Sequence, residues 1–567
     1  MEEFAALLDR LVLTPQRNAK LALMTAYFRA TPDPNRGYAL AALTGELDIP
    51  SVKPAMLRAL VEARVDPALF AYSYDYVGDL AETISLIWPG PSDLIASFPS
   101  PQPSPTRGEG EPRADGKVAG CGVGDNNPPP SLAVIVETLQ RASRAEGPRL
   151  VERWLDELDT TGRWALIKLV FGGMRIGVSA RLAKQALADL GGKAVNEIEE
   201  VWHGVAPPYA ALFAWIEGRG PRPESTVRAP FRPVMLSHAI ADDELARITP
   251  EEYAAEWKWD GIRVQAVNDA GTKRLYTRTG DDISHTFPDL TDGLDVEGAI
   301  DGELLIGAHE AAGFRLGSFS DLQQRLNRKS VSAKLMESHP AFIRAYDCLI
   351  DGTDDIRTLS FRERRARLER LVSRSLSRRI DLSPLLAYAN GAELAALRGT
   401  PPEAVIEGVM LKRWDSVYEP GRPKGPWFKW KRDPHTIDAV LMYAQRGHGK
   451  RSSYYSDYTF GVWRDLEGGG QELVPVGKAY FGFTDEELAE IDRYVRNNTV
   501  SRFGPVREVV HDAAKGLVLE VAFEGLARSS RHKSGVAMRF PRIARLRWDK
   551  PPSEADRLET LVKLVRA

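Results

Sequence analysis

The spacing of the apolar residues changes once along the chain, near residue 225. Before this point they recur every three or four positions, as with Phe4, Leu7, Leu8 and Leu11, which is the spacing of one helix face. After it, apolar and polar residues alternate in short runs, as in a strand with one buried face. One uniform fold cannot satisfy both periods, so the change predicts at least two kinds of domain.

This pattern divides the chain into three regions. It predicts an all-α domain over residues 1–225, an α+β domain over 226–435, and a small domain of about five short strands over 436–567. A chain of 567 residues is long enough for three or four domains of about 150 residues each. The helical pattern fails between residues 89 and 131, where Pro, Gly and Ser are frequent, so we expect a low-complexity insertion there.

Composition excludes several classes of protein. Hydrophobic residues make up 43% and charged residues 27% of the chain, which is typical of soluble globular proteins. No apolar run reaches the roughly 18 residues of a membrane helix, and acids at positions 2 and 3 argue against a signal peptide. With only Cys121 and Cys348, disulfide scaffolds and cysteine-rich zinc sites are excluded. We therefore expect a cytoplasmic protein without a membrane contact.

The segment Glu256-Trp257-Lys258-Trp259-Asp260-Gly261-Ile262-Arg263 predicts a strand that ends in a tight turn. Residues two apart on a strand share a face, so Glu256, Lys258 and Asp260 should face one pocket, with the acids flanking the amine. A lysine attacks as the free amine, which burial or a nearby cation favours. The alternative is a strand lysine in an ordinary salt bridge.

Further strands of the middle region carry charged or aromatic residues in a regular order. These residues are Arg278, Glu303, Tyr346, Glu407, Lys429 and Lys431. Two acids that face one pocket suit a divalent cation with waters and phosphates. Lysines suit a triphosphate, and an aromatic ring suits a stacked base. Each residue is a weak indication alone, because a Lys-x-Lys strand is usually a solvated face, but their order is specific.

Segments in the outer regions also have phosphate-binding character. Residues 76–80 and 171–179 lie where helices begin or meet, and exposed helix N-termini can bind phosphates, although plain helix junctions are the alternative. Residues 447–452 lack the first glycine and the Ser or Thr of a P-loop, so we interpret them as a basic loop. Residues 539–550 contain five basic residues.

This series resembles the nucleotidyltransferase motifs of the ATP-dependent DNA ligases, in the family's order. The resemblance implies that Lys258 is the nucleophile that takes AMP as a phosphoramidate. It implies that Glu256 contacts adenine through the local backbone. Arg263 and Arg278 would hold the nucleotide and the 5′-phosphate of a nick.

The same resemblance gives roles to the other residues of the middle region. Glu303 would contact the ribose and assist the metal site, and Glu407 would bind the metal, which is Mg²⁺ or alternatively Mn²⁺. Tyr346 stands where the family often has a phenylalanine that stacks on adenine. Lys429 and Lys431 would neutralise the α-phosphate of ATP.

The outer regions resemble other parts of these enzymes. Arg539 and Arg542 match the family's final motif and would orient the pyrophosphate leaving group. Gly78, Arg175 and Arg451 would contact DNA together with Arg278. The implied fold is an all-α N-terminal DNA-binding domain, an α+β nucleotidyltransferase domain similar to ATP-grasp enzymes, and a C-terminal OB-fold β-barrel.

The resemblance therefore implies an ATP-dependent ligase that seals 5′-phosphate/3′-hydroxyl nicks in duplex DNA during repair, recombination or replication. It implies a monomer that encircles nicked DNA and whose last domain swings between two poses. An RNA ligase or a capping guanylyltransferase is an alternative, against which the helical domain argues. An NAD-dependent ligase would carry a four-cysteine site, which the chain lacks. A catalytically silent nick-binding protein is the alternative from another class.

Overall fold

The computed structural model describes residues 1–565 except 71, 72, 74–78, 90–128, 225, 226, 311, 312, 327, 329, 447–453, 467, 505, 530 and 531. Most of the predicted insertion, Cys121 and the basic loop 447–452 thus lie outside the described residues. Among the helices that the structure describes, none is both long and apolar enough to cross a membrane.

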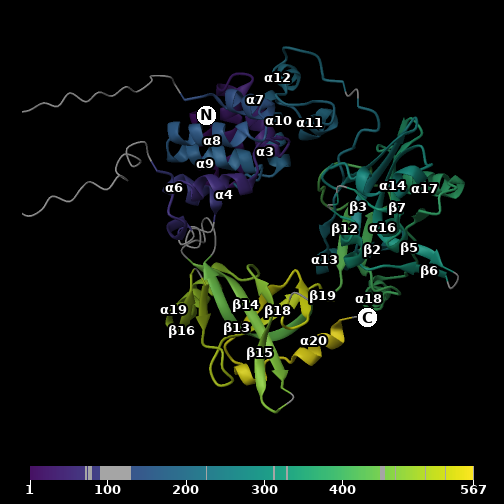
Figure 1. The fold of residues 1–567 in the computed structure, drawn as a ribbon. Coiled ribbons are helices and arrows are strands. Elements are labelled where there is room, and N and C mark those ends of the chain that lie inside the picture. Colours follow the sequence, from purple (N-terminus) through teal and green to yellow (C-terminus); the bar gives the residue numbers. More distant parts are fainter. Residues whose placement is uncertain are drawn as a thin grey trace, which may run out of the picture.

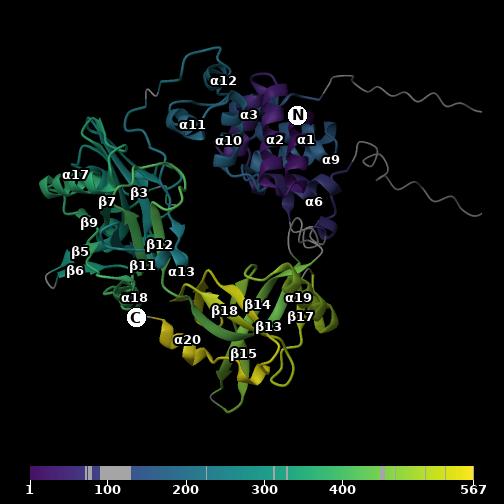
Figure 2. The same ribbon diagram turned by 180° about the vertical axis from the view of Figure 1, so that it is seen from behind.

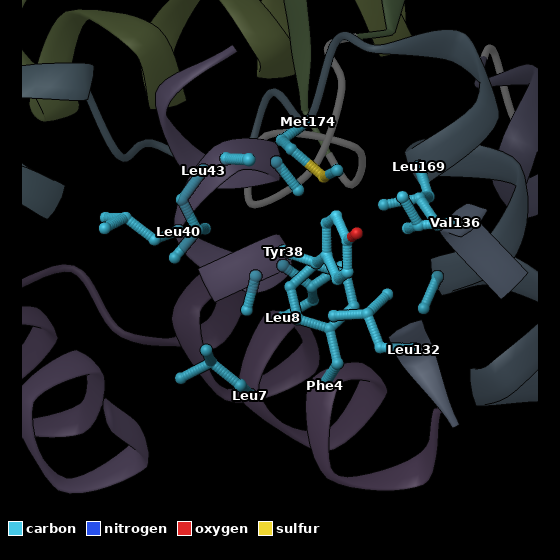
Figure 3. Close-up of a cluster of buried hydrophobic side chains, with 14 of the residues drawn as sticks. Phe4, Leu7, Leu8, Tyr38, Leu40, Leu43, Leu132, Val136, Leu169 and Met174 are labelled. Atoms are coloured by element: carbon cyan, nitrogen blue, oxygen red, sulfur yellow. The ribbon is translucent and has the colours of Figure 1, made fainter. Parts of the chain in front are cut away.

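The described elements before residue 217 are all helices. They are α1 (Glu2–Leu13), α2 (Arg17–Ala30), α3 (Asn35–Thr44), α4 (Pro54–Glu62), α6 (Leu80–Ile87), α7 (Leu132–Arg141), α8 (Glu146–Glu157), α9 (Thr160–Phe171), α10 (Ala180–Gly191), α11 (Val195–Trp202) and α12 (Ala210–Ile216). Their apolar faces meet in one core, where Phe4 and Tyr38 lie with Leu132 and Leu169 (Figure 3). Segments on both sides of residues 90–128 therefore belong to one helical body.

Polar side chains explain where several of these helices begin. Ser131 accepts a hydrogen bond from the backbone of α7, and Ser179 does the same for α10. α9 ends at Phe171 because Gly172 adopts the left-handed conformation, with φ of 71°. Residues 171–179 thus span the junction of α9 and α10, as the sequence predicts for a place where helices meet.

The middle region contains two sheets. The first has the order β1-β12-β11-β2-β10 and is formed by β1 (His238–Ala239), β12 (Trp427–Lys431), β11 (Ile406–Arg413), β2 (Tyr253–Trp259) and β10 (Leu385–Leu386). The second has the order β4-β3-β5-β7-β8, with β6 on β5 and β9 on β7. Its strands are β3 (Ile262–Asp269), β4 (Thr272–Thr277), β5 (Gly298–Glu310), β6 (Gly313–Leu316), β7 (Ala341–Asp351), β8 (Asp354–Asp355) and β9 (Ile380–Leu382). The helices are α13 (Asp242–Leu245), η1 (Ser284–Thr286), α14 (Pro288–Gly293), α15 (Phe319–Gln323), α16 (Ala333–Ser338), α17 (Phe361–Arg374) and α18 (Gly391–Gly399).

The turn at Asp260-Gly261 carries the chain from the first sheet into the second. β2 belongs to one sheet and β3 to the other, so Lys258, near the end of β2, lies where the sheets meet. Gly261 is needed at this crossing, because a Cβ there would stand 2.4 Å from the carbonyl oxygen of Leu304.

The last region is built mainly from strands. They are β13 (His435–Arg446), β14 (Tyr455–Asp465), β15 (Gln471–Ala479), β16 (Thr499–Phe503), β17 (Val506–Val509), β18 (Val518–Phe523), β19 (Gly525–Arg528), β20 (Val536–Arg539) and β21 (Arg542–Arg547), with α19 (Asp485–Asn497), η3 (Pro552–Glu554) and α20 (Leu558–Leu564). β14 pairs along one edge of β13, while β18 and β17 share the other edge in succession. The prediction of about five strands was too low, because the short hairpins β16–β17 and β19–β20 show little alternation.

The three regions lie around a common centre, with the helical region, the middle region and the last region each forming one corner (Figures 1 and 2). Arg357 of the middle region donates a hydrogen bond to Glu200 of α11 at 2.5 Å. The last region reaches the middle region at Lys431, whose Nζ lies 3.0 Å from the Glu524 carboxylate.

Candidate active site

A pocket of about 470 Å³ lies where the two sheets of the middle region meet. Most of the residues that the sequence predicts for the site line it. They are Glu256, Lys258, Arg263, Arg278, Glu303, Tyr346, Glu407, Lys429, Lys431 and Arg539. Both sheets and the β19–β20 hairpin supply them, so segments far apart in the sequence build one pocket.

Lys258 lies in β2 with 21% of its side chain exposed, and its ammonium donates a hydrogen bond to Oε1 of Glu407. Glu256 and Asp260 face the same pocket as Lys258, as expected, but neither acid forms an ion pair with its amine. Both acids line the pocket, but Glu256 pairs with Lys412 and Asp260 pairs with Arg539. The acid beside the amine comes from β11, a neighbouring strand that the local sequence does not reveal.

A bulge in β11 places Glu407 against the amine. The pairing of β11 with β2 shifts its register between Ile406 and Gly408, and such a bulge redirects the side chain at its centre. Gly408 has a φ of 151°, and a Cβ there would stand 2.2 Å from the carbonyl oxygen of Trp430. Only glycine therefore allows β12 to lie this close beside the bulge.

Glu407 is held between two lysines. Lys258 binds one carboxylate oxygen, and Nζ of Lys431 lies 3.1 Å from the other. Burial disfavours the charged form of Glu407, but the two ammonium groups outweigh it and lower the pKa of the carboxyl below its ordinary value. Lys258 must leave this ion pair before its nitrogen can attack another atom.

Glu303 of β5 is the acid of the pocket without a salt bridge to any residue that the structure describes. Burial raises the pKa of Glu303 to about 7, against the opposing charge of Lys258 and with added repulsion from Glu407. The carboxyl is therefore partly protonated near neutral pH. A cation that enters the pocket would favour its ionised form.

Lys429, Arg278 and Arg422 form a positively charged side of the pocket, and none has an ion pair within the described parts of the chain. Burial lowers the pKa of Lys429, and the charges of Lys258 and Arg422 lower it further. Burial and the charge of Arg263 lower the pKa of Arg278 in the same way. Cations that repel one another in a concave site bind a polyanion well, because it relieves the repulsion.

Tyr346 of β7 lines the pocket beside buried charged side chains. Nζ of Lys412 is 4.2 Å from the centre of the Tyr346 ring and 2.6 Å from the Glu256 carboxylate. Arg365 of α17 donates to the same carboxylate at 2.9 Å. The Glu256 side chain thus binds two protein cations.

A second buried ion pair fixes the strand that carries Tyr346. Arg364 of α17 donates two hydrogen bonds to Asp347, at 2.9 and 3.0 Å, and both side chains are fully buried. Because Asp347 follows Tyr346 directly, this bidentate pair holds the ring position against α17.

Arg263 of β3 is held mainly by the protein. Its guanidinium donates to the carbonyl oxygen of Met235 and to Asp301, each at 2.5 Å, and to the Tyr418 hydroxyl at 3.0 Å. Its Nε is buried without a partner among the described residues. Arg263 is therefore fixed in place where it lines the pocket.

Arg539 enters the pocket from the last region. Its guanidinium forms an ion pair with Asp260 and lies 4.2 Å from the centre of the Phe319 ring. Phe540, which has a φ of 51°, also lines the pocket. Arg542 begins β21 and is outside the set of residues that line the pocket.

The residues predicted to contact DNA are only partly described. Gly78 and Arg451 lie outside the described residues. Arg175 is exposed at the junction of α9 and α10, with a φ of 49°. Lys20 holds this junction, because its ammonium donates to the carbonyl oxygens of Ile176 and Gly177 at 2.7 and 3.0 Å.

Sequence reasoning missed three charged residues of the pocket, which are Arg422, Lys412 and Glu524. Arg422 follows Gly421 in an irregular loop without periodicity. Lys412 lies on β11, five residues after Glu407, and Glu524 lies at the start of a short hairpin. Strict alternation would place Lys412 on the opposite face from Glu407, and the bulge at Glu407 removes this difference, so none of the three had a usable signal.

Two family profiles match the chain. The profile described as ATP dependent DNA ligase domain matches residues 234–431, and the profile described as ATP dependent DNA ligase C terminal region matches residues 451–550. A protein named probable DNA ligase from Koribacter versatilis is 32% identical over 465 residues, which cover 77% of this chain and 78% of that protein. The chain belongs to the ATP-dependent DNA ligases. DNA ligase 1 of Korarchaeum cryptofilum is 29% identical over 99% of this ligase and 97% of its own length.

A solved structure named Pmar-Lig_PreS3 resembles the ligase over 96% of this chain and 99% of its own, with a TM-score of 0.55 and 14% identity, which shows a shared fold. The middle region is accordingly a nucleotidyltransferase domain, and the last region is an OB-fold-type ligase domain. As a member of this family, the protein is an enzyme that joins DNA with ATP through a lysine–AMP intermediate.

Proposed function

We propose that Lys258 is the residue of this ligase that takes AMP from ATP. The proposal is supported by the charged groups that surround its amine. Glu407 is its ion-pair partner, and Lys429, Arg278 and Arg422, which have no ion pair with any described residue, line the same pocket. The other lysines of the described pocket differ from it: Lys412 is only 2% exposed in its pair with Glu256, Lys431 pairs with two carboxylates, and Lys429 has no carboxylate partner among the described residues.

The first step makes one bond and breaks one. Nζ of Lys258, having lost a proton to solvent, bonds to the α-phosphorus of ATP, and the bond from that phosphorus to the bridging oxygen breaks. Pyrophosphate leaves with the electron pair. AMP then passes to the 5′-phosphate of a nick, and the 3′-hydroxyl attacks that phosphate and releases AMP. Each step gathers negative charge around phosphorus, which Lys429, Lys431 and Arg422 stabilise.

The remaining pocket residues hold the nucleotide. Tyr346 stacks on adenine, and the backbone at Glu256 contacts its edge. Arg263 lines the pocket and contacts the nucleotide, and Arg278 holds phosphate. Arg539 orients the pyrophosphate from its place beside Asp260, and Arg542 joins it when the OB-fold-type domain shifts.

The acids of the pocket fit Mg²⁺, with Mn²⁺ as an alternative. Mg²⁺ keeps several waters and takes one or two carboxylates together with substrate phosphates. Glu303 offers an unpaired carboxyl and Glu407 a second one, while no cluster of three or more potential ligands exists among the described residues. The ion would supply charge neutralisation at the phosphates, and Glu303 and Glu407 would hold it.

The three domains are assigned to residues 1–225, 226–435 and 436–567. Gly78, Arg175 and Arg451 contact nicked duplex DNA together with Arg278, and the helical domain is the DNA-binding domain. The arrangement around a common centre in Figures 1 and 2 supports a monomer that encircles DNA. We assign the enzyme to the cytoplasm, because a chain with only two cysteines fits a reducing compartment, and we assign it a role in repair, recombination or replication.

The test is to incubate the protein with α-³²P-ATP and Mg²⁺ and to separate it on a denaturing gel. We expect an acid-labile, base-stable label on the native protein and none on Lys258→Ala. Lys273→Ala is the matched control, because Lys273 lies on β4 and donates to a backbone carbonyl outside the pocket.

Protein that is purified already adenylated would take no label, so each sample is first treated with pyrophosphate. A label that persists on Lys258→Ala after this treatment would overturn the assignment of the nucleophile. A nicked duplex added to the labelled protein then shows whether AMP moves to DNA.

A further inference from the structure

The β19–β20 hairpin of the OB-fold-type domain presents an acid and a base side by side to the pocket. Glu524, directly before β19, donates its backbone N–H to the carbonyl oxygen of Arg539 at 3.0 Å. The two side chains then cross to the nucleotidyltransferase domain, where Glu524 pairs with Lys431 and Arg539 pairs with Asp260. Glu524 and Arg539 are thus complementary in charge to Lys431 and Asp260, the residues that they contact at the mouth of the pocket.

The contact of Glu524 is made by both of its carboxylate oxygens. Nζ of Lys431 lies 3.1 Å from Oε1 and 3.0 Å from Oε2. The same ammonium lies 3.1 Å from Glu407, whose other oxygen binds Lys258. A continuous chain of ion pairs therefore runs from the OB-fold-type domain to the nucleophile.

An acid at this place works against nucleotide binding. The pocket gathers the cations that a triphosphate needs, and a carboxylate on its rim repels the same anion. Arg539 can stabilise both the bound phosphates and the contact between the two domains, so either role explains an arginine at this position. Glu524 can stabilise only the contact between the domains, because its negative charge repels ATP.

We infer that Glu524 is a positioning residue for lysine adenylation, and that its pairing with Lys431 holds the OB-fold-type domain in the pose that brings Arg539 to the pocket. The inference rests on the proposed role of Lys258. It assigns no part to Glu524 in the later steps, because a domain that clamps DNA must leave the pocket rim.

The contact is suited to repeated opening. The Lys431 and Glu524 side chains are 37% and 29% exposed, and a half-exposed pair contributes little and is weakened by salt. Such a pair biases the pose of the domain without locking it. Its loss should slow the first step about three- to fivefold.

The experiment compares two steps in Glu524→Gln, Glu524→Lys and wild type. One is single-turnover labelling by α-³²P-ATP after pyrophosphate treatment, and the other is sealing of a nick that already carries the adenylate. We expect Glu524→Gln to slow labelling about three- to fivefold and Glu524→Lys to slow it more than about tenfold, because two ammonium groups then face each other. Sealing of the adenylated nick should stay within about twofold for both.

Glu520→Gln is the matched control, because Glu520 lies on β18 of the same domain and pairs with Arg545 at 3.2 Å inside that domain. It should leave both steps unchanged. Raising the salt concentration should slow wild-type labelling more than Glu524→Gln labelling, since only the wild type has the pair to screen.

Two results would overturn the inference, namely unchanged labelling in Glu524→Lys or an equal loss in both steps. Thermal unfolding of each variant separates misfolding from a lost contact. Failure of the proposed function is distinct, because it is seen as persistent label on Lys258→Ala whatever the Glu524 variants do.

Discussion

Replacing Glu303 with Gln should stabilise the ligand-free protein at alkaline pH and leave its stability at acid pH unchanged. Glu303 is the pocket acid that lacks a salt bridge within the described residues, and burial raises the pKa of its carboxyl from an ordinary 4.5 to about 7. Above pH 7 the folded protein must hold this group charged in a poorly solvated site. Glutamine has nearly the same shape and carries no charge.

The sign follows from proton binding. Between pH 4.5 and 7 the folded state keeps a proton on Glu303 that the unfolded state has already released, so raising the pH through this window lowers the free energy of unfolding. The full shift corresponds to roughly 3 kcal/mol, at about 1.4 kcal/mol for each pH unit. Partial exposure to the open pocket reduces the effect, and we expect about 1–3 kcal/mol in favour of the variant at pH 8.

Differential scanning calorimetry without ATP or metal measures this effect, because it resolves the transitions of separate domains. In the transition of the nucleotidyltransferase domain, Glu303→Gln should melt about 3–8 °C higher at pH 8 and at the same temperature at pH 4.5. Glu337→Gln, at an exposed position of the same domain, should show no difference at either pH. A stabilisation that is equal at both pH values would refute the reasoning, since a charge effect must depend on ionisation.

Three further changes test other parts of the structure. Arg422→Ala should slow lysine adenylation about tenfold in single-turnover labelling, because it removes a pocket cation that has no ion pair among the described residues, while Lys424→Ala in the same loop should not. Arg364→Leu should lower the free energy of unfolding by about 3–5 kcal/mol in calorimetry, because it leaves Asp347 buried and unpaired. Asp79→Ala should cost about 1–2 kcal/mol by removing the cap of α6, and should weaken binding of nicked DNA without changing adenylation.

Each of these has an outcome that would contradict it. Equal slowing by Arg422→Ala and Lys424→Ala would mean that the loop, not the cation, matters. A near-normal melting temperature for Arg364→Leu would show that Asp347 finds another partner. Slower adenylation by Asp79→Ala would mean that the helical domain affects the pocket directly.

The helical region illustrates how much the apolar pattern reveals. Stripes such as Phe4, Leu7 and Leu8 predict the helices, because burial of one helix face needs side chains at fixed angular intervals. The pattern cannot reveal where a helix ends when a backbone conformation decides it, as Gly172 does for α9. It also cannot reveal that segments on both sides of residues 90–128 share one core.

The sequence alone determined which residues are available for chemistry and that they lie on strands. Lys258 lies in a segment where apolar and polar residues alternate, which indicates a strand. The order of Glu303, Tyr346 and Glu407 along the chain is the basis of the family resemblance. These features depend on neighbouring residues or on order along the chain, so they can be recognised from the sequence without a structure.

Only the tertiary structure decided which charges meet. Glu256 turns to Lys412 and Arg365, whereas Glu407 reaches Lys258 through a bulge in another strand. The pairing of Glu524 with Lys431 joins two domains and has no signal in either segment. Ion pairing depends on distances of a few ångströms between strands far apart in sequence, and folding of the whole chain sets those distances.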